Sequence, residues 1–112
     1  MRDVAGWDMA ERSKLISKFY RLKMAGELRR FLEALPIRSV QETQIGDSIY
    51  MANGELRVGH MYYPVGIRVW FKHDKIVAQI TAPKAHVSVY ADPFDPSGTA
   101  ELVRLATVKA AS

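Results

Sequence analysis

The chain has no cysteine and no long hydrophobic run among its 112 residues. Without cysteine there can be no disulfide, no thiolate nucleophile and no cysteine-based zinc or iron–sulfur site. No apolar stretch approaches the roughly 18 residues that a membrane-spanning helix needs. The N-terminus, MRDVAGWD, carries no apolar block behind a basic start, so a secretory signal is not expected. These absences favour an intracellular, cytoplasmic protein that does not enter a membrane.

The composition that is present fits one small domain with a modest basic excess. A chain of this length is expected to form a single domain, here residues 1–112. Its hydrophobic fraction of 48% and charged fraction of 25% are ordinary for a globular protein. The formal net charge of +4 permits a polyanionic partner but does not require one.

The N-terminal third, residues 8–35, carries a helical pattern. Leu15, Phe19 and Leu22 lie on one stripe at helical spacing. Past Gly26 the apolar stripe changes phase, so either Gly26 separates two helices or one long helix is buried on two sides. Glycine in a helix interior costs about 1 kcal/mol relative to alanine, which favours a break or a kink at this point.

The middle of the chain, residues 37–90, is typical of an antiparallel meander. Residues 37–43 are expected to form a first strand. Asn53-Gly54 is the preferred pair for a two-residue type I′ turn, which predicts a hairpin within IYMANGELRV. Pro64 and Gly66 predict a bend or bulge over residues 61–66.

A second hairpin is predicted over RVWFKHDKIVAQI, residues 68–80, with His73-Asp74 as its turn. That register places three apolar pairs opposite each other: Phe71 and Ile76, Val69 and Ala78, and Ile67 and Ile80. The agreement across the pairs supports the register, because a slip of one residue would send every side chain to the other face.

The C-terminal part is expected to close the fold. Residues 86–90 alternate as a last strand, and two Asp-Pro pairs predict a loop over residues 91–98. A helix is predicted over residues 99–110, capped by Ser97 or Thr99, although its β-branched content leaves a strand as an alternative. The predicted fold class is α+β. It consists of an N-terminal helix or kinked helix pair on a curved antiparallel meander of five or six strands, with a short C-terminal helix.

Candidate residues for metal binding and catalysis are few. His60, His73 and His86 lie far apart, without the spacing of a metal site. The predicted Asn53-Gly54 hairpin would bring Asp47 opposite His60, a pair with acid–base potential that is better explained as a structural hydrogen bond. Because no nucleophile or phosphate-binding loop accompanies the pair, we predict no catalytic residue, metal or cofactor and interpret the protein as non-enzymatic.

Nucleic-acid binding is the function that the charge placement favours. The second hairpin would present cations interleaved with a tryptophan on its outer face, where Lys and Arg neutralise phosphates and the indole stacks on a base. A basic stripe on the N-terminal helix adds phosphate contacts. The predicted nucleic-acid-binding residues are Lys14, Lys18, Arg21, Arg68, Trp70, Lys72 and Lys75. The predicted function is therefore that of a small accessory protein that binds DNA or RNA.

Two alternatives stay open. In the first, the same surfaces are buried in a protein interface. The protein would then be a homo-oligomer, or an accessory or inhibitory subunit of a larger complex. Tyr, Trp, Met and Arg favour this alternative, since they are enriched in interface cores. In the second, the sheet curls into a pocket for a small ligand, lined by Tyr62, Tyr63 and Phe71. A simpler structural explanation of Trp70 is a cross-strand pair with Val77 that lies under a helix.

Overall fold

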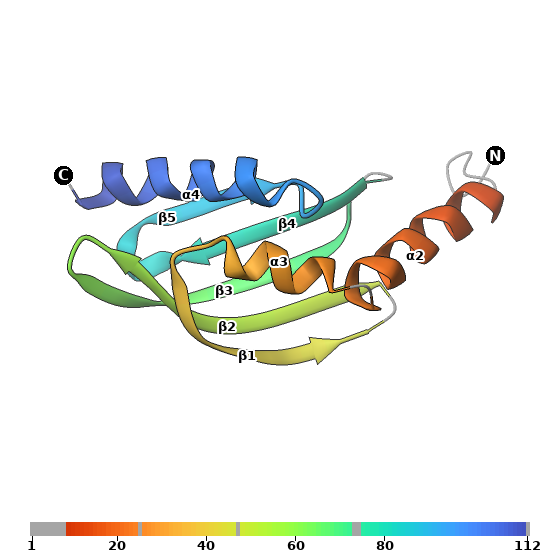
Figure 1. The fold of residues 1–112 in the computed structure, drawn as a ribbon, viewed down its shortest axis with the longest axis horizontal. Coiled ribbons are helices and arrows are strands. Elements are labelled where there is room, and N and C mark those ends of the chain that lie inside the picture. The colour runs from red at the N-terminus through yellow and green to blue at the C-terminus, as the bar shows by residue number, and fades with distance from the viewer. Residues whose placement is uncertain (1–8, 25, 47, 73–74, 112) are drawn as a thin grey trace.

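The computed structural model of the chain describes residues 9–24, 26–46, 48–72 and 75–111. Five antiparallel strands form one sheet in the order β1-β2-β3-β4-β5, with β1 and β5 as its free edges (Figure 1). The strands are β1 (Ile37–Ile45), β2 (Ile49–Val58), β3 (Met61–Lys72), β4 (Lys75–Ala82) and β5 (Val87–Ala91). The helices are α2 (Met9–Met24), α3 (Glu27–Glu33) and α4 (Pro96–Ala111), with a short 3₁₀ turn, η1 (Pro83–Ala85), between β4 and β5. The predicted α+β class with a meander is confirmed.

The break at Gly26 is also confirmed, and the single continuous helix is wrong. Gly26 separates α2 from α3 with φ of 78°, a left-handed conformation that glycine adopts without a steric penalty. The change of direction lets both apolar stripes reach one core. Phe19 and Leu22 of α2 and Phe31 of α3 are fully buried there.

The predicted turn at Asn53-Gly54 is wrong. Both residues lie inside β2, where they face Gly66 and Val65 of β3. The turn that joins β2 to β3 is Gly59-His60, and Gly59 has φ of +65°. A continuous β2 pairs with both β1 and β3, and this gain in backbone hydrogen bonding outweighs the local preference for a turn.

Residues 61–66 do not form the predicted bend, because they begin β3. Pro64 faces Glu55 of β2. The pairing of β3 with β4 reaches only as far as Gly66 opposite Thr81. Pro64 therefore lies where β3 has one neighbouring strand, a position at which a residue without a backbone N–H is tolerated.

The register predicted for residues 68–80 is confirmed. Phe71 faces Ile76 and Val69 faces Ala78, as the apolar alternation requires. The predicted turn residues His73 and Asp74 lie outside the described residues. The last paired positions before them are Lys72 and Lys75.

The C-terminal element is a helix, so the strand alternative is wrong, and it begins at Pro96, earlier than predicted. Neither Ser97 nor Thr99 is its cap: the carboxylate of Asp95 accepts a hydrogen bond from the backbone N–H of Gly98 at 3.1 Å. Proline fits the first helical position because its missing N–H would be unpaired there in any case. The hydroxyl of Thr99 instead donates to the carbonyl of Asp92 at 3.1 Å.

The core lies between the sheet and the helices. Alternate residues of β2 to β5 point into it, and the ring of Phe19 lies 5.4 Å from that of Phe71, centroid to centroid. Val103 of α4 is fully buried against the same core. We call this side of the sheet the helix-covered face, since α3 and α4 lie across it (Figure 1).

Candidate functional site

The opposite side of the sheet, which we call the open face, carries the predicted hairpin surface. Residues that face each other in the antiparallel register share one side of a sheet, so the pairings extend this surface over all five strands. Its residues include Arg38, Glu55, Tyr62, Arg68, Trp70, Lys72, Lys75, Val77, Gln79, Ser88 and Tyr90. Trp70 and Val77 face each other here, as the cross-strand alternative supposed, on the side of the sheet opposite to α3 and α4.

Three pairs of a cation and an aromatic ring mark the open face. The guanidinium carbon of Arg68 lies 4.1 Å from the ring centroid of Trp70. The ammonium of Lys72 lies 4.8 Å from the ring centroid of Tyr90. At the other end of the sheet, the guanidinium carbon of Arg38 lies 3.4 Å from the ring centroid of Tyr62. Such contacts hold a cation over the negative face of a ring.

The aromatic rings of Trp70 and Tyr90 also touch each other across the sheet. Their centroids are 6.2 Å apart in an edge-to-face arrangement. Tyr90 is 51% exposed and Trp70 is half-buried. Arg68 is fixed further by a hydrogen bond of 3.2 Å from its guanidinium to the Gln79 side chain. Rings and cations therefore form one connected surface over β3, β4 and β5.

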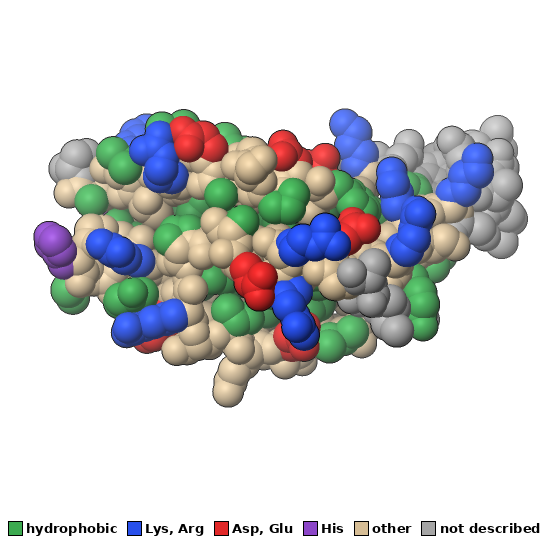
Figure 2. Space-filling model, in the orientation of Figure 1, with side chains coloured by type: hydrophobic (Ala, Val, Ile, Leu, Met, Phe, Trp, Pro, Cys, Tyr) green, Lys and Arg blue, Asp and Glu red, His purple; other side chains and the backbone are tan. Residues whose placement is uncertain are grey.

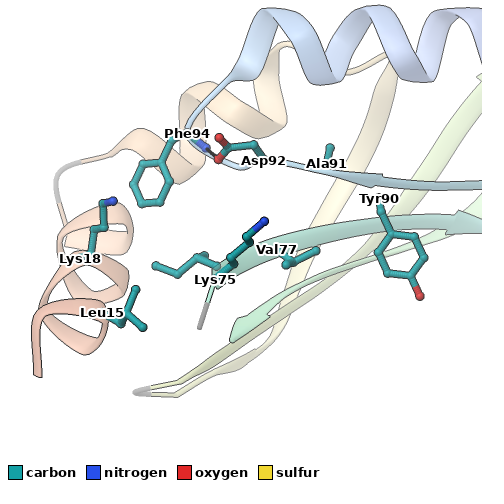
Figure 3. A pocket seen from close by; sticks show the side chains of 9 residues that line it. Leu15, Lys18, Lys75, Val77, Tyr90, Ala91, Asp92 and Phe94 are labelled. Atoms are coloured by element: carbon teal, nitrogen blue, oxygen red, sulfur yellow. Dashed lines mark hydrogen bonds between the residues drawn. The ribbon is translucent and has the colours of Figure 1, made fainter. Parts of the chain in front are cut away.

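The helix stripe and the hairpin face meet at one cavity of about 510 Å³ (Figure 3). Lys18 of α2, Lys75 of β4 and Tyr90 of β5 all line this cavity, which we call the Lys18–Lys75 cavity. Lys18 also lies over the ring of Phe94, at 5.3 Å from its centroid. The structure thus brings one residue of the predicted stripe beside the predicted hairpin surface.

The other two residues of the stripe, Lys14 and Arg21, are exposed on α2 and do not line that cavity. Lys and Arg side chains gather over α2, at the right of the view in Figure 2. Lys14 and Arg21 are therefore solvent-facing side chains that lie outside the cavity.

Sequence reasoning missed three residues of the cation–aromatic pairs on the open face: Arg38, Tyr62 and Tyr90. Tyr90 belongs to an alternating run that was read as a strand, but its position beside Trp70 depends on the β4–β5 register, in which it faces Gln79. Tyr62 lies in the segment, residues 61–66, for which the sequence predicts a bend. Arg38 lies in β1 and is bound to Glu55 by an ion pair of 2.9 Å.

A second cavity, of about 580 Å³, lies on the helix-covered face between α3 and the β1 edge. We call it the Tyr50 cavity. It is lined by Gly26, Leu28, Arg29, Leu32, Val40, Glu42, Ile45 and Tyr50. The sequence predicted a ligand pocket lined by Tyr62, Tyr63 and Phe71. None of these three residues lines the Lys18–Lys75 cavity or the Tyr50 cavity.

Tyr50 is the largest fully buried side chain in the described part of the protein, and its hydroxyl has no hydrogen-bond partner there. Burial, reinforced by the Glu42 carboxylate, raises the pKa of the Tyr50 phenol far above its ordinary value. The Glu42 carboxylate raises the pKa of the phenol both through a side-chain hydrogen-bonding interaction and through its negative charge. A buried hydroxyl left unpaired costs about 1–3 kcal/mol, so this group is an anomaly within the core.

The acid–base pair of Asp47 and His60 was predicted from the Asn53-Gly54 turn, which does not form. Asp47 lies outside the described residues, and His60 is an exposed residue of the turn between β2 and β3, at the opposite end of β2 from Ile49. His86 is exposed and ends the η1 turn in a left-handed conformation. Among the described residues, no group of three or more His, Asp or Glu side chains is arranged to hold a metal ion.

Exposed apolar residues also follow α4. Leu102, Leu105 and Val108 are each about half exposed on this helix. They are the kind of surface on which the predicted homo-oligomer or accessory-subunit role would depend, and that role stays a prediction. No helix in the described part of the chain is long and apolar enough to cross a membrane.

Comparison of the chain with protein-family models, with curated proteins and with solved structures finds no match. Its function therefore has to be inferred from its own residues.

Proposed function

We propose that this protein is non-enzymatic and binds single-stranded DNA or RNA across the open face of its sheet. The observation that carries the proposal is the alignment of three cation–aromatic pairs on one uncovered face: Arg38 with Tyr62, Arg68 with Trp70, and Lys72 with Tyr90. Aromatic rings supply stacking surfaces for bases, and the neighbouring cations neutralise phosphates.

The arrangement of these groups suits unstacked bases better than a duplex. A base can stack on an exposed aromatic ring or on the plane of an arginine guanidinium, and Arg68 over Trp70 offers both. Each base stacked on an aromatic side chain contributes about 1–3 kcal/mol. Tyr62 and Trp70 are eight positions apart in β3, which corresponds to roughly 26 Å at the rise of a β-strand. That length accommodates several nucleotides.

The basic stripe of α2 extends the proposed path. Lys18 and Lys75 line one cavity together with Tyr90, so a strand leaving Tyr90 would meet two ammonium groups. Lys14 and Arg21 are exposed further along the same helix. In this proposal they contact phosphates, whereas Trp70 and Tyr90 contact bases.

The test is fluorescence anisotropy with labelled single- and double-stranded DNA and RNA across a salt titration. We expect micromolar affinity for single strands at low salt, with log K falling by about 0.7 per log salt for each phosphate contacted. Trp70→Ala should weaken binding by roughly 5- to 100-fold, the equivalent of one stacked base, and should leave the salt slope unchanged. Lys72→Gln combined with Lys75→Gln should lower the slope by about 1.4.

The matched control is Arg104→Gln on α4, which removes one positive charge away from the open face and should change affinity little. In a Trp7→Phe background, the emission of Trp70 should be quenched when an oligonucleotide is added. Flat anisotropy traces at low salt, or wild-type affinity in Trp70→Ala, would rule the proposal out and direct attention to a protein partner.

A further inference from the structure

We propose that this protein forms a homodimer in which the α4 helices of two copies pack against each other in antiparallel orientation. The residues that make the contact are Glu101, Leu102, Leu105, Val108 and Lys109, which we call the α4 stripe. They lie on a helix that covers the side of the sheet opposite to the open face (Figure 1). The dimer is therefore independent of the proposed nucleic-acid surface, and it leaves the open face of each copy uncovered.

The apolar part of the α4 stripe lies on the outer side of the helix. Val103 and Thr107 are buried on the inner side. At about 100° per residue, Leu105 points to nearly the opposite side of the helix from Val103. Leu102, Leu105 and Val108 are each about half exposed and follow one another at every third position. Single apolar residues are normal on a protein surface, whereas a contiguous apolar row with charged neighbours marks an interaction site.

The α4 stripe is complementary to itself about Leu105. Three residues to either side stand aliphatic side chains, Leu102 and Val108, and four residues to either side stand opposite charges, Glu101 and Lys109. An antiparallel pair with both copies of Leu105 on a twofold axis brings Leu102 level with Val108 of the second copy. It also brings Glu101 level with Lys109 of the second copy. A parallel pair would place like charges beside each other at both ends, which is repulsive. The charges therefore favour a second copy of this chain in antiparallel orientation.

The acidic end of the stripe can accept a second cation. The carboxylate of Glu101 is bound by the guanidinium of Arg104 on its own helix at 2.6 Å, and both side chains are more than half exposed. A carboxylate has two oxygens and about four lone-pair sites, so it can also accept the ammonium of Lys109 from the second copy. Over α4, at the upper left of Figure 2, hydrophobic side chains reach the surface beside a basic and an acidic one.

The size of this contact predicts a weak dimer. Helix α4 has 16 residues, which corresponds to a length of about 24 Å. Two helices of this length with three aliphatic side chains each form an interface at the low end of the size range, below about 1,200 Å² in total. We therefore expect a dissociation constant of roughly 10–100 μM.

The experiment is sedimentation equilibrium of the full chain from about 5 to 500 μM, a range that brackets this affinity. The mean mass should rise with concentration from 12.6 kDa toward twice that value. Leu105→Glu puts two carboxylates together on the twofold axis and should weaken the dimer at least tenfold. Ile45→Glu is the matched control, because it makes the same kind of change at an exposed aliphatic residue of β1, and it should leave association intact. Thermal melts confirm that each variant is folded.

Cysteine variants test the antiparallel arrangement. Because the chain has no cysteine, Leu105→Cys introduces one thiol per copy, and the two thiols meet on the twofold axis. Oxidation by diamide, which takes up the two thiol hydrogens, should join them in a disulfide-linked dimer. Val108→Cys should not cross-link with itself. It should cross-link with Leu102→Cys when the two variants are mixed.

Charge reversal tests the two ends of the stripe. Glu101→Lys and Lys109→Glu should each weaken the dimer about two- to fivefold, because each places like charges level with each other. The variant that carries both changes restores opposite charges across the axis and should regain the wild-type affinity. This recovery depends on contact between the two copies, since neither change repairs a contact that the other removes within one helix.

The proposal is overturned if the mass stays at the monomer value at the highest concentration, or if Leu105→Glu associates as the wild type does. It is also overturned if Val108→Cys cross-links with itself as efficiently as Leu105→Cys, or if the double charge reversal restores nothing. Oligonucleotide binding by Leu105→Glu should equal that of the wild type, so a failure of this proposal is distinguishable from a failure of the proposed function.

Discussion

Replacement of Tyr50 by Phe is expected to stabilise the protein, although it removes a polar group from the largest buried side chain. The ring stays in place, so the packing against the core is kept, and only a hydroxyl without a partner is lost. Such a hydroxyl costs about 1–3 kcal/mol in the folded state. We therefore expect the free energy of unfolding to rise by roughly 1 kcal/mol or more. For a domain of this size, that is about 4 °C in Tm per kcal/mol.

Urea denaturation followed by circular dichroism measures this change. With an m-value of about 1–3 kcal/mol/M, the transition midpoint should rise by roughly 0.5 M while m stays constant. Tyr90→Phe is the matched control, since Tyr90 is 51% exposed and the change removes no buried polar group. Its effect should stay within about 0.5 kcal/mol. A loss of stability in Tyr50→Phe would refute the reasoning, because it would mean that the hydroxyl has a favourable partner, with Glu42 as the first candidate.

Three further predictions concern pH, the β2–β3 turn and the core. Burial raises the pKa of the Tyr50 phenol above its ordinary value near 10. Above about pH 10, the phenol therefore loses its proton in the unfolded chain before it does so in the folded protein. The free energy of unfolding of the wild type should then fall relative to that of Tyr50→Phe, by up to about 1.4 kcal/mol per pH unit. Urea melts at pH 9 and pH 11 measure this; if the wild type and Tyr50→Phe differ in free energy of unfolding by the same amount at both pH values, the prediction is contradicted. Gly59→Ala should lower the free energy of unfolding by about 1–2 kcal/mol, because the φ of Gly59 is +65°. Gly66 has no positive φ, and a Cβ added there would have no atom closer than 3.9 Å. Gly66→Ala should therefore be neutral or stabilising in the same melts. Phe19→Ala should lower the free energy of unfolding by about 3–5 kcal/mol, because the ring of Phe19 is fully buried. Ile16→Ala is the control and should lower it far less, since Ile16 is partly exposed. Equal losses in the two variants would mean that α2 does not pack on the core through Phe19.

The fold could be predicted where the apolar patterns of two strands agreed with each other. It could not be predicted where the prediction depended on a single turn dipeptide. The register of residues 68–80 was predictable because apolar residues alternate in phase on both strands. Asn53-Gly54 carries the strongest turn signal in the chain, yet it lies within β2. A better guide was the phase of the buried residues, since Tyr50 and Ala52 before the supposed turn and Leu56 and Val58 after it all lie at even positions of one strand. Continuous alternation favours one long strand.

The candidate sites depend on contacts between distant segments, which limits what a single sequence can show. The open surface around Trp70 was predictable because its members share one hairpin. Tyr90 reaches Trp70 only through the β4–β5 register. The Tyr50 cavity combines a residue of β2 with residues of α3 and β1, and its unpaired hydroxyl leaves no trace in the sequence.

The open face also shows how a small protein can keep aromatic rings in water. A single sheet in a domain of this size buries one face, and the other face is normally covered with polar side chains. Here the stems of Arg38, Arg68 and Lys72 lie over the rings of Tyr62, Trp70 and Tyr90. A long cationic side chain covers apolar surface while its charge stays hydrated. In the proposed function, the same side chains would turn outward, which would free the ring for a base and bring the cation to a phosphate. One set of contacts thus covers the rings in the free chain and supplies the groups that the proposed binding would use.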